Sequence, residues 1–343
     1  ISITEQFPDH QFSWKVLGAV LIQTGRISES LVANQKSIKL TPQDAEAHNN
    51  LGNTLKELGR LEEAEASYTQ AIALKPDYAE AYNNLGNMHQ ELDRFDESEA
   101  SLRQAITLKP DFAEAHSSLA VTLNQLGRFN ESLASLRQAI TLKPDYIKAH
   151  INLLQYLYLL DKESLFVAEL DYLINQDEAN AVTGSLTCRS ELKYGLEKPN
   201  LFCREPLKYV LHIDLNSQYD FEEIFVEKAR SILNENKISN RKQSLLVNGY
   251  QTSGNLFDIE NSFTEKIQKA IRLEIEKYRI NFKNSEEGLI KKWPTEYSLY
   301  GWLISMKSGG ELQPHIHDLS WLSGSIYINV PLKSKADSGN LVV

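Results

Sequence analysis

The chain has 343 residues, enough for two domains of ordinary size, and 42% of them are hydrophobic. Its net charge of −10 argues against a nucleic-acid partner, because a phosphate-binding surface needs an excess of Lys and Arg. The two cysteines, Cys188 and Cys203, do not amount to a disulfide framework and favour a reducing, cytoplasmic location. The longest apolar run, at 153–160, is too short to span a bilayer, so we expect no membrane partner.

Both ends of the sequence suggest truncation. The chain starts at Ile1 rather than at Met, and Pro8-Asp9 stands where a repeat would end. At the other end, Leu341-Val342-Val343 follows the turn signal Ser338-Gly339 and has the character of a strand cut short. We therefore expect a fragment of a longer protein, with one more repeat upstream.

The N-terminal half repeats itself every 34 residues. Proline recurs at this interval, at Pro8, Pro42, Pro76, Pro110 and Pro144. The full units are 11–44, 45–78, 79–112 and 113–146, and a closing helix begins at Ile147. The predicted helical array thus covers residues 1–160.

Each unit has the composition of a helical hairpin. In 45–78, Leu51, Leu55 and Leu58 share one helix face, and Gly52 allows a close helix approach. Gly59-Arg60 ends the first helix, and Lys75-Pro76 ends the second. A single hairpin cannot bury its apolar face, so neighbouring units stack into a superhelix. This pattern resembles the tetratricopeptide repeat (TPR) family, which implies a groove that binds a peptide or a partner protein.

Asparagines gather on the first helices of two units, where their side chains would hydrogen-bond a peptide backbone in the groove. The alternative is that they are solvated or make helix–helix contacts. These residues are Asn49, Asn50, Asn53, Asn83, Asn84 and Asn87. Three histidines share a repeat column with Trp14 and Tyr82, and we interpret that column as a packing position rather than a metal site; they are His48, His116 and His150.

After residue 160 the repeat register disappears. We interpret 161–205 as the end of the array plus a connector, and 206–343 as a second domain. Leu207–Ile213 is a weak strand candidate, Gly249–Asn255 a turn-rich loop, and 256–282 a long amphipathic helix. Repeats followed by a helix and then strands predict a multidomain chain, with an all-α superhelix before an α+β domain.

The last segment combines strands with paired histidines. Strand candidates are Tyr297–Met306, which ends at Ser308-Gly309-Gly310, then 322–331, and a third that starts at Asn340. Between the first two lies Pro314-His315-Ile316-His317. Residues i and i+2 of an extended segment point the same way, so we expect His315 and His317 to lie at chelating distance. The alternative is a pair of solvated strand histidines.

The ordered set Gly-Gly, Pro-His-x-His, Ser-Gly-x-x-Tyr and Ser-Gly-x-Leu resembles the Fe(II)/2-oxoglutarate-dependent oxygenase superfamily. It is most similar to the 2OG-Fe(II) oxygenase family whose members carry His-x-His before Ser-Gly-x-x-Tyr. The resemblance implies a double-stranded β-helix (jelly-roll or cupin-like), here incomplete at its C-terminus. It also implies Fe(II) as cofactor and 2-oxoglutarate as cosubstrate.

Carried onto this sequence, the resemblance implies that His315 is the first iron ligand and that His317 takes the place where many relatives have a carboxylate. Asp318 is an alternative ligand, and Tyr327 would bind the 2-oxoglutarate carboxylate. Trp302 and Trp321 are candidates to line the substrate pocket, although Trp302 also fits a buried packing position. The distal His ligand and the basic 2-oxoglutarate-binding residue would follow Val343, so we expect this fragment to be inactive or weakly active.

Two functions compete. The first is an oxygenase that hydroxylates a C–H bond of a substrate recruited by the repeats. The alternative is a non-catalytic TPR adaptor that mediates protein–protein interaction. A glycosyltransferase or sulfotransferase joined to the repeats is disfavoured, because the sequence has no phosphate-binding loop of the type Gly-x-x-x-x-Gly-Lys-Ser/Thr.

Overall fold

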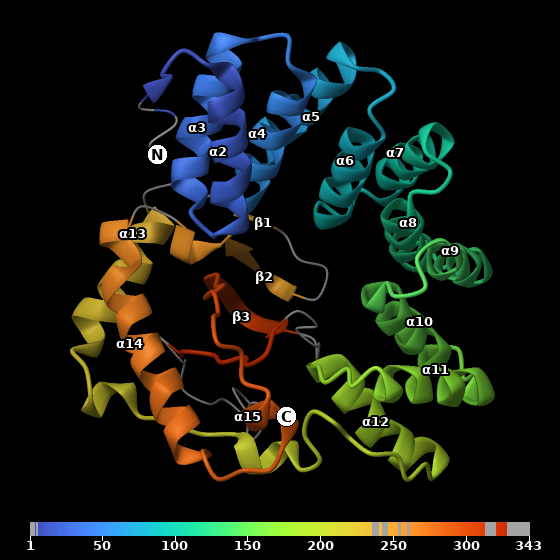
Figure 1. Cartoon of the computed structure of the whole chain (residues 1–343). Helices are drawn as coiled ribbons and strands as arrows, with labels where there is room; N and C mark the ends of the chain where they lie inside the picture. The colour runs from blue at the N-terminus through green and yellow to red at the C-terminus, as the bar shows by residue number, and fades with distance from the viewer. Residues whose placement is uncertain are drawn as a thin grey trace.

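The computed structural model describes residues 4, 6–234, 240–241, 246–252, 255–258, 261–312 and 320–327. The N-terminal half is an arc of antiparallel helix pairs, blue to green in Figure 1. Each predicted unit contains two helices, and a further helix follows the last unit, as predicted. The helices are α2 (Gln11–Gln23), α3 (Ile27–Leu40), α4 (Ala45–Glu57), α5 (Leu61–Leu74), α6 (Ala79–Glu91), α7 (Phe95–Leu108), α8 (Ala113–Gln125), α9 (Phe129–Leu142) and α10 (Ile147–Leu159).

Glycine sets the distance between the two helices of a unit. At Gly52 an added Cβ would lie 2.6 Å from the Tyr68 ring, and at Gly86 it would lie 2.6 Å from Leu102 Cγ. Both partners are fully buried on the second helix. The close approach predicted from the glycine column therefore positions α4 on α5 and α6 on α7.

The arc continues beyond the predicted repeats. Residues 161–205, which we expected to include a connector, form α11 (Glu163–Asn175) and α12 (Ala181–Tyr194). Phe166 and Leu170 of α11 and Val182 of α12 share one buried cluster with Leu154 of α10. The superhelix thus carries two more packed helices before the chain turns at Gly195, which has φ +68°.

The C-terminal part combines helices with a small antiparallel sheet. Its strands lie in the order β1 (Asn240–Arg241), β2 (Leu246–Thr252) and β3 (Ile304–Leu312). The predicted amphipathic helix is present as α14 (Asn261–Asn281), preceded by a 3₁₀ turn at Leu256–Asp258. The remaining elements are η1 (Pro206–Tyr209), η2 (Leu215–Ser217), the π-helical turn η3 (Glu222–Val226), α13 (Glu227–Asn234) and α15 (Gly288–Lys291).

Two of the predicted segments have a different structure. The strand predicted at Leu207–Ile213 is wrong, because Pro206 opens a 3₁₀ turn and Lys208 N bonds to Glu205 O at 3.0 Å. The loop predicted at Gly249–Asn255 is also wrong over its first part, because β2 runs to Thr252. Gly249 is needed there, since an added Cβ would lie 2.8 Å from the Ser305 carbonyl oxygen of β3.

The predicted strand boundaries near the C-terminus also change. β3 begins at Ile304 rather than Tyr297, and it continues through Gly309-Gly310 to Leu312. Its register with β2 shifts between Val247 and Gly249, where Asn248 has φ +52°. Residues 322–327 have no strand, and the rest of that predicted strand lies outside the described residues.

The sheet lies on the inner side of the helical arc (Figure 1). Lys292, after α15, contacts the turn between α11 and α12, where its Nζ lies 2.5 Å from Asp177 Oδ1. At the other end of the arc, Ser298 Oγ lies 4.0 Å from the position of a Cβ at Gly25. The described residues do not form a double-stranded β-helix, and among them no helix is both long and apolar enough to cross a membrane.

Candidate functional site

The predicted metal ligands His315, His317 and Asp318 lie outside the described residues, but the chain is anchored on both sides of them. On one side, Leu312 pairs with Leu246 at the end of β3. On the other, Trp321 Nε1 donates to the Leu289 carbonyl oxygen of α15 at 2.8 Å. The described part of the chain contains no group of three or more His, Cys, Asp or Glu side chains that would hold a metal ion by itself.

The other predicted C-terminal site residues lie in different environments. Trp321 packs edge-to-face on Phe202, with ring centroids 5.4 Å apart, so it contributes to an interior contact. Trp302 is half-buried and meets Tyr300 edge-to-face at 5.8 Å. Tyr327 is 55% exposed and lies in a segment without regular secondary structure. The described residues do not bring Tyr327 and the two tryptophans into one pocket.

The backbone before β3 is fixed by one asparagine. Asn255 Oδ1 accepts from Gly301 N at 3.0 Å, and Asn255 Nδ2 donates to Leu299 O at 3.0 Å. Asn255 is buried. These two hydrogen bonds therefore fix the backbone of 299–301 just before β3.

The six predicted groove asparagines differ in their contacts. Asn84 Nδ2 donates to Asn49 Oδ1 at 3.0 Å, which links α6 to α4, and Asn53 Oδ1 accepts from the Tyr68 hydroxyl at 2.7 Å. By contrast, Asn83 is only 7% exposed and its Oδ1 has no hydrogen-bond partner among the described residues. An unpaired buried carbonyl is costly, so the described contacts alone do not account for an asparagine at this position. Asn50 and Asn87, the remaining two, are half-buried.

The histidine column has a structural role, as predicted. His48, His116 and His150 each place Nε2 2.9–3.0 Å from the carbonyl oxygen of the proline six residues earlier. Trp14 makes the same contact, donating from Nε1 to Pro8 O at 2.8 Å. The column therefore secures the turn that precedes each first helix.

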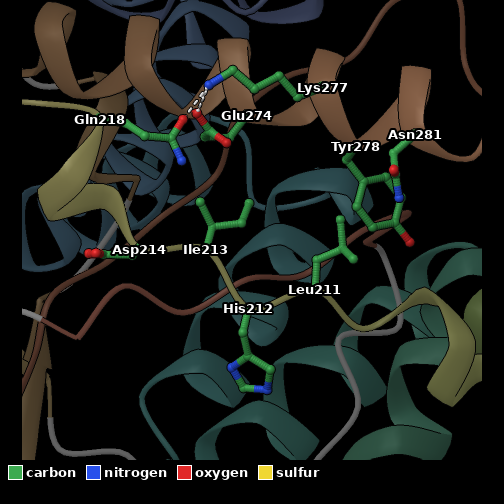
Figure 2. Close-up of a pocket in the computed structure, with 9 residues that line it drawn as sticks. All are labelled: Leu211, His212, Ile213, Asp214, Gln218, Glu274, Lys277, Tyr278 and Asn281. Atoms are coloured by element: carbon green, nitrogen blue, oxygen red, sulfur yellow. Dashed lines mark hydrogen bonds and ion pairs between the residues drawn. The ribbon is translucent and has the colours of Figure 1, made fainter.

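A shallow cavity of about 320 Å³ lies between α14 and residues 211–218 (Figure 2). Lys277 Nζ bonds there to Glu274 Oε1 and to Gln218 Oε1, both at 2.6 Å. Although burial alone would raise the pKa of Glu274, the hydrogen bonds from Lys277 and Tyr219 lower it below its usual range. None of the predicted site residues lines this cavity, which is formed by Leu211, His212, Ile213, Asp214, Gln218, Glu274, Lys277, Tyr278 and Asn281.

One polar residue near the sheet was not anticipated. Gln251 in β2 is 9% exposed, and its Oε1 has no hydrogen-bond partner among the described residues. It pairs with Ile304 at the start of β3. Because the sequence placed Gln251 in a loop, alternation along the strand could not mark it as buried.

Comparison with known proteins supports both parts of the chain. Residues 33–66, 79–112 and 113–146 match family descriptions that read "Tetratricopeptide repeat", and residues 52–93 match "TPR repeat". Residues 300–341 match "Putative 2OG-Fe(II) oxygenase". No curated protein matches the sequence.

Two solved structures show the likeness of the helical part. Pseudomonas aeruginosa pilF is 20% identical, with a TM-score of 0.50, and the match covers 54% of this chain and 84% of that one. A chain of the APC/C hetero-tetramer Cut9-Hcn1 is 17% identical, with a TM-score of 0.52, and the match covers 57% of this chain and 39% of that one. At this identity the likeness concerns the fold alone. The chain thus joins an array of tetratricopeptide repeats to a C-terminal segment that matches a 2OG-Fe(II) oxygenase family.

Proposed function

We propose that the protein is an Fe(II)/2-oxoglutarate-dependent oxygenase whose repeats recruit a protein or peptide substrate. The observation that carries the proposal is the family match at 300–341, which includes His315, His317 and Tyr327. In this family the bound iron and 2-oxoglutarate supply the chemistry that hydroxylates a C–H bond. His315 and His317 would hold the metal, Asp318 is the alternative ligand, and Tyr327 would bind 2-oxoglutarate.

The described residues support this assignment through the anchors on either side of the histidines. β3 fixes the chain as far as Leu312, and the hydrogen bond from Trp321 to Leu289 fixes it again beyond the pair. A metal site needs ligands that are held by a supporting shell, and these contacts supply support close to the pair. The proposal includes a double-stranded β-helix fold for the oxygenase domain.

The repeats would supply the substrate. The sheet lies inside the arc of helices (Figure 1), so a segment bound to the inner face would lie near the β3 end of the domain. Asn83 keeps a polar side chain at a buried position where its Oδ1 has no partner in the described chain, which is expected of a residue retained for binding rather than for stability. Asn49, Asn50, Asn53, Asn84 and Asn87 complete the proposed peptide-binding set.

The natural protein that contains this sequence provides the test. With Fe(II), it should convert 2-oxoglutarate to succinate even without a substrate, and His315→Ala and His317→Ala should each abolish the conversion. His212→Ala is the matched control, because His212 is exposed and lies on another segment of the same domain. A folded protein that neither binds Fe(II) nor forms succinate would instead be a TPR adaptor.

A further inference from the structure

The contact between the superhelix and the C-terminal part is built around one asparagine side chain. Asn200 Nδ2 donates to the Gly184 carbonyl oxygen of α12 at 2.9 Å and also contacts Cys188 Sγ at 3.2 Å. Its Oδ1 accepts from the backbone N–H groups of Phe202 and Cys203, both at 3.0 Å. This carboxamide is 9% exposed and uses both its donor and its acceptor, so α12 and the 200–203 turn are held by the same group.

The 200–203 turn also contacts α15. Leu289 N donates to the Phe202 carbonyl oxygen at 2.7 Å. Glycine is required at both sides: a Cβ at Gly184 would lie 2.8 Å from Phe202 Cβ, and a Cβ at Gly288 would overlap the Leu201 carbonyl oxygen. The backbone of 201–202 is therefore closely packed between α12 and α15.

A further set of contacts connects this turn and α15 to Trp321, in the segment next to the histidine pair. The ring of Phe202 packs edge-to-face on Trp321, and Trp321 Nε1 bonds to Leu289 O. Both rings pack against a buried cluster of four residues, Cys203, Tyr278, Leu289 and Ile290. At its other end α12 is part of the superhelix core through Val182 and Leu186. Buried and partly buried side chains thus form a continuous series of contacts from the core of the arc to Trp321, which stands four residues after His317.

We propose that Asn200 and Phe202 are positioning residues that join the superhelix and the C-terminal part into one mechanical unit and so fix Trp321 relative to the inner face of the repeats. The coupling does not depend on the proposed function. Its consequence for the reaction rests on that function: loosening the junction would impair turnover that requires a repeat-bound substrate more than it impairs substrate-free 2-oxoglutarate turnover.

Hydrogen exchange tests the coupling in the chain itself, without metal. Asn200→Ala removes the link to α12, and the amide of Leu289 is the reporter on the far side. We expect exchange in 285–293 to become about tenfold faster, because a buried hydrogen-bonded group is lost. Asn180→Ala is the matched control: Asn180 Oδ1 accepts from Thr183 N at 2.9 Å at the start of the same helix and does not touch the turn. It should accelerate exchange in the first turn of α12 and leave 285–293 unchanged.

Two results would overturn the proposal. One is an unchanged rate at 285–293 in Asn200→Ala, and the other is equal acceleration there by Asn180→Ala, which would indicate a general loss of stability. If Asn200→Ala does not fold, Trp321→Phe provides the test from the other end, because it keeps the ring on Phe202 and removes the donor to Leu289 O. Faster exchange of the Phe202 and Cys203 amides supports the coupling, and an unchanged rate contradicts it. Failure of the succinate assay affects neither outcome.

Discussion

At the scale of single residues, a substitution of Asn83 distinguishes a role in binding from a role in supporting the fold. The same repeat position holds Asn49, Ser117 and Ile151 in neighbouring units, so an apolar side chain fits there. Asn83→Ile removes a buried carbonyl that has no partner in the described chain, and we expect the free energy of unfolding to rise by about 1 kcal/mol. Urea unfolding measures this change. A residue that is retained for binding at the expense of stability is expected to gain stability when it is replaced.

The matched control is Asn53→Leu. Asn53 Oδ1 accepts a hydrogen bond from the buried Tyr68 hydroxyl, so its loss should lower the free energy of unfolding by about 1–3 kcal/mol. A loss of more than about 1 kcal/mol in Asn83→Ile would show that Asn83 supports the fold. Peptide binding by the inner face would then have to rest on the other asparagines.

The buried His150 predicts a dependence of stability on pH. Burial lowers the pKa of His150, but the hydrogen bond and charge of Glu169 and the Pro144 carbonyl raise it above its ordinary value overall. Because the folded-state pKa is the higher one, the stabilisation is complete below the unfolded value of about 6.5 and is lost as the pH rises through the folded value. The free energy of unfolding should therefore decrease as the pH rises from the unfolded value through the higher folded-state pKa of His150.

His150→Tyr, which introduces the residue found at Tyr82, should remove this part of the pH dependence when unfolding curves are compared across the range. His116→Tyr is the control, because His116 also bonds to a proline carbonyl but has no carboxylate partner in the described chain. If the wild type and His150→Tyr lose stability in parallel as the pH rises, the His150–Glu169 pair does not cause the decrease.

At the scale of the element, the turn inside each hairpin depends on one residue with positive φ. Gly59 and Gly127 have φ +71° and +73°, whereas Asp93 adopts φ +56° at the same repeat position. A side chain in this region costs about 1 kcal/mol, somewhat less for Asp than for most residues. Asp93→Gly should therefore raise the free energy of unfolding by about 0.5–1 kcal/mol, and Gly127→Asp should lower it by a similar amount.

Thermal or urea unfolding of the two variants checks this prediction as a pair. The exchange is well matched, because Asp93 is exposed and a Cβ at Gly127 would meet no atom of the described chain within 4 Å. Opposite signs for the two variants support the account. If both variants lose stability, the Asp93 side chain contributes an interaction that outweighs its backbone strain.

The same elements show what the sequence can and cannot predict. Helices of the array were predictable because their signals are local: Gly52 faces Tyr68 only 16 residues away, and the turn glycines recur in each unit. Strands depend on distant partners. Gly249 looked like a turn residue until its contact with Ser305 was known, and the apolar segment at Leu207–Ile213 has no strand partner in the described chain.

Site residues, too, can be predicted from the sequence only where the sequence pattern itself is the signal. The His315–His317 pair stands out because its spacing is itself the signal, and the family match includes it. The roles of Asn200 and Trp321 were not predictable, because they arise from contacts with Gly184 and Leu289 that no repeated column marks, and Trp321 was expected to line a substrate pocket. The identity of a residue does not indicate which residue elsewhere in the chain it contacts.

At the scale of the whole molecule, the repeats and the C-terminal part form a scaffold around a sheet (Figure 1). Their contacts at Asn200 and at Lys292–Asp177 connect the helical array to the C-terminal part of the chain. An exposed ion pair such as Lys292–Asp177 contributes about 1 kcal/mol at most, so the buried junction at Asn200 dominates the connection. Under the proposed function, this connection would hold a substrate bound to the repeats in a fixed position relative to the site of hydroxylation.

The most direct test of the central claim uses isotopically heavy oxygen gas. The natural protein that contains this sequence is supplied with Fe(II) and 2-oxoglutarate, and the succinate is examined by mass spectrometry. The account predicts that one heavy oxygen atom enters each succinate and that His315→Ala eliminates the labelled product. Succinate without label, or equal labelled succinate from His315→Ala, would contradict the claim that this chain carries an oxygenase.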